Sequence, residues 1–137
     1  MSTMTKSVLA IAAIFSTAAL AAWGNDPPAA TVAFKPVQPL EKLMEGQKKL
    51  HAEIKDAILD KAWEEAQVSA WLLAEIANVN HYQKPDPEFR ALATKMSGEC
   101  VELANLLAKR DQKGAMEQYT RIGKTCGACH EKYEKKE

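Results

Sequence analysis

From residue 40 onward, hydrophobic side chains recur every three or four positions in four successive stretches of the chain. This spacing places them on one face of an α-helix, and the strict alternation typical of strands is almost absent. The pattern predicts four amphipathic helices, at about residues 40–59, 62–79, 87–110 and 114–135. Short connections favour antiparallel neighbours, so we expect an all-α protein with the architecture of an antiparallel four-helix bundle.

Turn-forming residues separate these stretches. Asp60-Lys61 breaks the pattern after the first helix, and Asp111-Gln112-Lys113 breaks it before the fourth. Between the second and third helices, two prolines forbid a continuous helix, and Asp86 followed by Pro87 is typical of a capped helix start. The third helix has the clearest apolar face, formed by Phe89, Leu92, Ala93, Met96, Cys100, Leu103 and Leu107.

The N-terminal segment has a different pattern. Lys6 is the only charged residue before an apolar run at residues 8–22, and Ala19-Leu20-Ala21 is typical of a signal peptidase site. The run is shorter than the about 20 apolar residues that span a membrane. We therefore predict a signal peptide at residues 1–21 and an exported, periplasmic location. The alternative is an uncleaved anchor, which alone would associate the protein with a membrane.

Residues 22–39 contain Pro27, Pro28, Pro36 and Pro39, which oppose helix formation and predict an extended leader. The predicted folded domain is residues 40–137, long enough to bury one core. Without residues 1–21 the chain has 17 basic and 18 acidic residues. Because no basic excess is present, nucleic acid is not an expected partner.

The chemistry of the chain concentrates in Cys126-Gly127-Ala128-Cys129-His130, which ends seven residues before the C-terminus. Two thiols at this spacing, followed directly by an imidazole, are typical of a covalent attachment site for c-type haem. In a helix the three side chains share one face. The motif predicts one haem c, bound through Cys126 and Cys129, with His130 as an axial ligand of the iron. Cys100 is then left as a free, buried thiol.

Other sites with paired cysteines fit the chain less well. A thioredoxin-like redox pair requires strands alternating with helices, which the pattern does not predict. A structural zinc site requires about four ligands, and His51, His81 and Cys100 form no second closely spaced pair. A plain disulfide would leave His130 without a role.

Four helices with the haem motif in the last one resemble the class II c-type cytochromes, the family of cytochrome c prime and its low-spin relatives of the cytochrome c556 kind. The resemblance covers about Leu40 to Tyr133, and the haem motif is its only sharp feature. It implies that residues of the first helix face the distal side of the haem. In c556-like members a methionine there binds the iron, and Met44 of this chain matches that region.

A thioether ligand favours ferrous iron, so ligation by Met44 would make the protein a low-spin electron carrier. Three states of the sixth position remain open: Met44, His51, or a vacant site with Met44 as core filler. His51 lies on the same face, about 10 Å further along the helix. A vacant site would instead indicate a five-coordinate protein that binds nitric oxide or carbon monoxide.

We expect a single-haem cytochrome whose function is one-electron transfer between redox partner proteins, and no catalytic residues, since no acid–base or nucleophile cluster is evident. Arg121 and Lys124 precede the thiols by one to two turns and are candidates to contact the haem propionates, or are ordinary solvated residues. The resemblance also implies that two copies can pair through the first two helices, where Trp63 and Trp71 are located.

Overall fold

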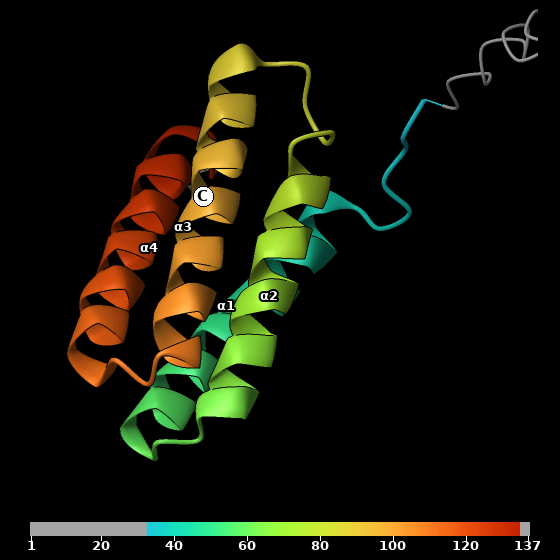
Figure 1. Ribbon diagram of the computed structural model, residues 1–137. Coiled ribbons are helices and arrows are strands. Elements are labelled where there is room, and N and C mark those ends of the chain that lie inside the picture. Colours follow the sequence, from blue (N-terminus) through green and yellow to red (C-terminus); the bar gives the residue numbers. More distant parts are fainter. Residues whose placement is uncertain (1–32, 135–137) are drawn as a thin grey trace, which may run out of the picture. The chain divides into compact units, whose positions relative to one another are not determined.

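The computed structural model describes residues 33–134, in which four helices form the bundle (Figure 1). They are α1 (Leu40–Leu59), α2 (Trp63–Asn80), α3 (Pro87–Ala108) and α4 (Gln112–Tyr133). The predicted all-α, antiparallel four-helix architecture is confirmed. The predicted signal peptide and most of the leader lie outside the described residues. No helix within residues 33–134 is long and apolar enough to cross a membrane.

The helix starts follow from side-chain capping. Asp86 accepts hydrogen bonds from the backbone N–H groups of Glu88 at 2.8 Å and Phe89 at 3.1 Å. Pro87 occupies the first turn of α3, where its missing N–H group has no intrahelical partner to lose. The predicted start of the third helix is therefore confirmed.

α4 begins at Gln112, two residues earlier than the sequence predicts, because Asp111 caps it. The Asp111 carboxylate accepts a hydrogen bond from the N–H of Gly114 at 3.0 Å. A Cβ atom at Gly114 would lie 2.4 Å from Oδ2 of Asp111, so any other residue here would displace the capping carboxylate. Arg110, with a φ of 56°, makes the sharp turn that precedes the cap.

The core lies among all four helices and combines large and small side chains. α2 contributes an alanine stripe of Ala66, Ala70, Ala74 and Ala77, and these small residues allow its neighbours to approach closely. The other helices contribute larger side chains. Those that are fully buried include Ile54, Ile58, Leu103, Leu107 and Ile122. Cys100 is buried with them, as predicted.

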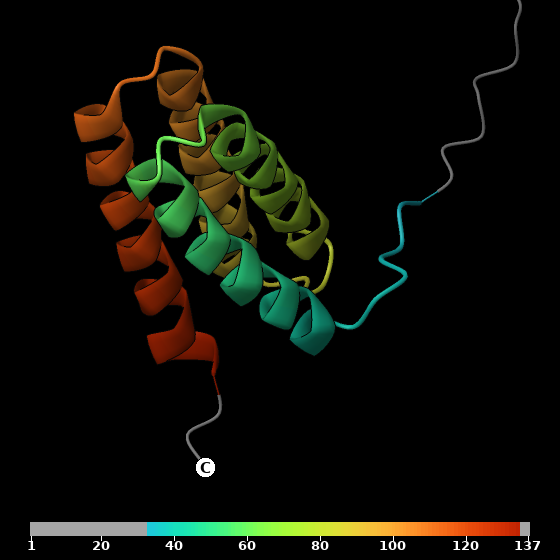
Figure 2. The same ribbon diagram turned by 90° about the horizontal axis from the view of Figure 1, so that it is seen from below.

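The four helices do not pack equally. Each helix packs extensively on its neighbour in the chain, whereas the first and last helices, also adjacent in the bundle, pack on each other much less. Figure 2 shows α1 and α4 close together where α1 ends and α4 begins, and diverging toward the start of α1 and the end of α4. The haem motif lies in the diverging half of α4.

Candidate functional site

Cys126 and Cys129 lie three residues apart on α4, and both are free, half-buried thiols. Cys126 faces the core, where its Sγ lies 3.9 Å from Sδ of Met96 on α3. Burial raises the pKa of both thiols above the ordinary value. A Cβ built at Gly127, between the two cysteines, would meet no neighbouring side chain within 4 Å, so this position of the motif faces open space.

His130 follows directly and points out of the core. About half of its side chain is exposed, at 48%. Its Nδ1 lies 3.8 Å from a carboxylate oxygen of Glu134, one turn further along α4. The imidazole could therefore bind a metal without breaking a contact in the core. The predicted attachment residues form a contiguous donor set on the last two turns of the helix.

In the middle of α1, His51 reaches α4. Its Nδ1 lies 2.9 Å from the hydroxyl of Tyr119, and the two rings stack with centroids 4.1 Å apart. The Nε2 atom is buried and has no hydrogen-bond partner in the described part of the chain. It lies 3.9 Å from the Cβ position of Gly123. Desolvation lowers the pKa of this imidazole below the ordinary value.

This contact fixes which residues of the two helices lie opposite each other. α1 and α4 run in opposite directions, so a step back along α1 corresponds to a step forward along α4 (Figure 2). Met44 precedes His51 by seven residues, and His130 follows Gly123 by seven residues. Both steps correspond to about 10 Å at 1.5 Å per residue. Met44, half-buried on the same face of α1 as His51, therefore lies at the level of His130, where the helices diverge.

The comparison with known families agrees with this arrangement. The family model described as Cytochrome C' matches residues 35–134, most of the chain. The chain belongs to the cytochrome c′ family. No curated protein and no solved structure matches it. Membership makes it a c-type cytochrome and implies haem c as its cofactor.

The residues present in this chain fit a covalent haem. Two thiols and an imidazole on one helix segment are the donors that attachment and axial ligation require. The unpartnered Nε2 of His51 and the space where α1 and α4 diverge both lie on the side of α4 that carries His130. A thioredoxin-like arrangement is not present, because every regular element within residues 33–134 is a helix.

Arg121 lies away from these donors. Its Nε donates a hydrogen bond to Oε1 of Gln118 at 2.5 Å, and its guanidinium lies 3.7 Å from Glu102 of α3. Arg121 precedes His130 by nine residues, about two and a half helical turns, and therefore lies on the opposite face of α4. The predicted contact with haem propionates stays a prediction, and it would require Arg121 to leave both partners. Lys124 is exposed.

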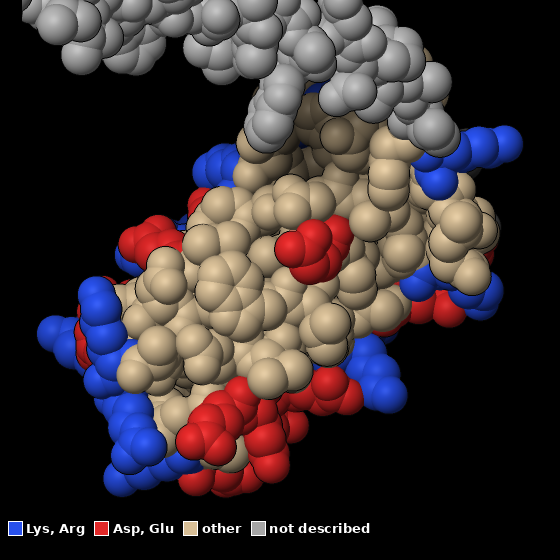
Figure 3. Space-filling model, turned by 45° about the vertical axis from the view of Figure 1, so that its right-hand side comes forward, with Lys and Arg blue, Asp and Glu red and all other residues tan. Residues whose placement is uncertain are grey.

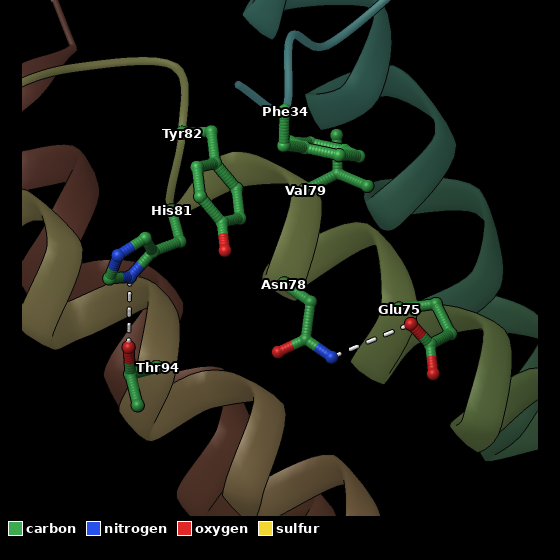
Figure 4. A pocket seen from close by; sticks show the side chains of 7 residues that line it. All are labelled: Phe34, Glu75, Asn78, Val79, His81, Tyr82 and Thr94. Carbon is green, nitrogen blue, oxygen red and sulfur yellow. Dashed lines mark hydrogen bonds between the residues drawn. The ribbon is translucent and has the colours of Figure 1, made fainter. Parts of the chain in front are cut away.

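A pocket of about 480 Å³ lies on a different side of the bundle, beside α2 and α3 (Figure 4). His81, in the connection that follows α2, is half-buried at its edge, and its Nδ1 lies 3.1 Å from the Thr94 hydroxyl. Phe34 of the leader packs on Tyr82 with ring centroids 4.6 Å apart. None of the haem-motif residues lines this pocket.

Proposed function

We propose that the protein is an exported, single-haem cytochrome that transfers one electron at a time, with His130 as the proximal ligand and Met44 as the distal ligand. Haem c, when bound, supplies an iron ion that alternates between the ferrous and ferric states. The observation that carries the proposal is the register of α1 and α4. The His51 and Tyr119 contact leaves Met44 and His130 at one level, two turns from where the helices meet.

The chain's own residues have separate tasks on this proposal. Cys126 and Cys129 would each hold the cofactor on α4 through one thioether. His130 would bind the iron through its imidazole, and the neutral, soft thioether of Met44 would favour the ferrous state relative to a second imidazole. Met96 and the apolar core below Cys126 exclude water from that side.

The absorption spectra of the purified protein in both oxidation states test this proposal. We expect a low-spin spectrum in both states, with the charge-transfer band of a methionine bound to ferric iron. A high-spin ferrous form that binds carbon monoxide readily would overturn the Met44 ligation and favour the five-coordinate, gas-binding alternative. A colourless protein would overturn the cytochrome function itself.

We also propose that a second copy of the chain packs on α2. Its outer face carries Val68, Trp71 and Leu72, which are 58%, 41% and 50% exposed. These positions are three and four residues apart and so form one stripe. Figure 3 shows a broad area free of Lys and Arg over this side of the molecule, and α2 itself contains no basic residue. Since α2 packs chiefly on α1 and α3, pairing on its outer face would leave the haem-bearing helix free for redox partners.

Export is part of the same proposal. The thiols of Cys126 and Cys129 must reach the compartment in which haem is attached to them. Residues 1–21 would be removed on the way, and the mature chain would begin at Ala22. Mass spectrometry of the protein isolated from its native host tests this directly. A mass that retains residues 1–21 would instead support an N-terminal membrane anchor.

A further inference from the structure

Lys84, in the connection between α2 and α3, is held in place from two directions. Its backbone carbonyl accepts a hydrogen bond from Nε of Arg90 at 3.1 Å. Pro85 follows it and restricts its backbone to extended conformations. The side chain is half-buried rather than free in solvent. A lysine in a surface connection therefore has a defined position in this protein.

Its ammonium group lies over two aromatic rings. The Nζ atom is 5.4 Å from the ring centroid of Phe89 on α3 and 5.2 Å from that of Tyr133 on α4. The two rings meet edge to face, with centroids 5.2 Å apart and planes at 89°. Each ring attracts a cation at this distance through its quadrupole. The pair therefore fixes a positive charge at the C-terminal end of α4.

No described carboxylate lies within salt-bridge distance of Lys84, whereas Lys132, which lies over the same Tyr133 ring at 5.6 Å, pairs with Glu88. Asp86, the other acidic group nearby, accepts hydrogen bonds from the first turn of α3. The charge of Lys132 is thus largely balanced. The ammonium of Lys84 has no such ion pair among the described residues and lies only against the two aromatic rings.

The charge is close to the attachment site. Tyr133 follows Cys129 by one helical turn on the same face of α4, so a cation over the Tyr133 ring is a neighbour of Cys129. This position places Lys84 at the edge of the attachment site.

We propose that Lys84 is a positioned charge that raises the reduction potential of the haem. A fixed cation near the iron opposes the additional positive charge of the ferric state, and this effect is larger where water is partly excluded. The inference rests on the proposed function, because it concerns a property of the bound cofactor. It assigns Lys84 a role in tuning that cofactor and none in binding the iron.

Spectroelectrochemical titration of the holoprotein tests the inference in four variants. Lys84→Met removes the charge but keeps most of the apolar stem, and Lys84→Arg keeps the charge. Lys132→Gln removes the balanced neighbour. Lys109→Gln removes a charge beyond the far end of α3, which at 22 residues is about 33 Å long.

We expect Lys84→Met to shift the midpoint potential to a more negative value than wild type, and by more than Lys132→Gln does. Lys84→Arg and Lys109→Gln should keep the wild-type potential. A Lys84→Met potential no lower than that of Lys109→Gln, with normal haem content, would overturn the inference and leave the cytochrome function intact. A protein without haem would instead overturn the proposed function, so the two failures are distinguishable.

Discussion

His51 on α1 and Tyr119 on α4 are joined by a contact of 2.9 Å between Nδ1 and the hydroxyl oxygen, and their rings stack. The two residues are 68 positions apart in the sequence. They connect the first and last helices, which pack on each other less than the other neighbouring helices do. Counted along both helices from this contact, Met44, and not His51, shares the level of His130.

The burial of His51 predicts how stability depends on pH. Its pKa lies below the ordinary value of 6.5 in the folded protein, so the unfolded chain takes up a proton at a higher pH than the folded one. The contribution of His51 to the free energy of unfolding is therefore fully present above pH 6.5. It is lost as the pH falls through the lowered pKa of the folded state. Urea unfolding between pH 8 and pH 5 should show wild type losing stability relative to His51→Gln.

Tyr119→Phe is the matched control for that experiment. A backbone hydrogen bond with Tyr119 raises the pKa of His51 and so opposes part of the effect of burial. Tyr119→Phe keeps that backbone and an aromatic ring beside His51, so its loss of stability in acid should match that of wild type. Parallel pH profiles of wild type and His51→Gln would contradict the burial described for His51.

The cysteines should differ sharply in their effect on haem retention. Cys126→Ser and Cys129→Ser should each leave a single covalent link, and the double variant should lose haem stain on a denaturing gel. Cys100→Ala is the control, because that thiol is fully buried among core residues, with a pKa raised to about 12 by burial. Covalent haem in the double variant, or its loss in Cys100→Ala, would refute the assignment.

Core substitution should reveal how far the bundle depends on α3. Leu103 is fully buried, so Leu103→Ala should lower the free energy of unfolding by about 2–5 kcal/mol through lost burial and a remaining cavity. Leu59, at the end of α1, is 53% exposed, and Leu59→Ala should change the free energy of unfolding by no more than about 0.5 kcal/mol. Denaturant titration of both variants provides the comparison, and equal losses would argue against this core.

The outer stripe of α2 predicts self-association. Trp71→Lys should shift the protein from dimer to monomer in sedimentation velocity, because it places a charge inside the apolar contact. Tyr82→Lys is the control, since Tyr82 is similarly exposed but lies at the α2–α3 connection. A wild-type protein that is monomeric at all concentrations, or a dimer that tolerates Trp71→Lys, would exclude this surface.

Periodicity and capping residues were sufficient to predict the helices. The first was predicted at its observed bounds, and Asp86 with Pro87 located the start of α3 correctly. The largest differences, of two residues, are at the end of α3 and at both ends of α4. The Asp111 cap extends the start of α4 toward the turn at Arg110, a local effect that an apolar pattern does not encode.

Long-range polar contacts could not be predicted in the same way. Asn80 of α2 donates a hydrogen bond to Gln47 of α1 at 3.1 Å within the core, although both residue types are ordinarily exposed. The position of Lys84 likewise depends on Phe89 and Tyr133, which belong to two different helices. Such pairs depend on how helices rotate against each other, which one sequence does not determine.

The Met44 ligation is tested most directly by the oxidised absorption spectrum of Met44→Ala beside that of His51→Ala. The account predicts that the methionine-to-iron charge-transfer band is present in wild type, disappears in Met44→Ala and persists in His51→Ala. A band that survives in Met44→Ala, or a wild-type spectrum without it, would contradict the register in which Met44 lies across from His130.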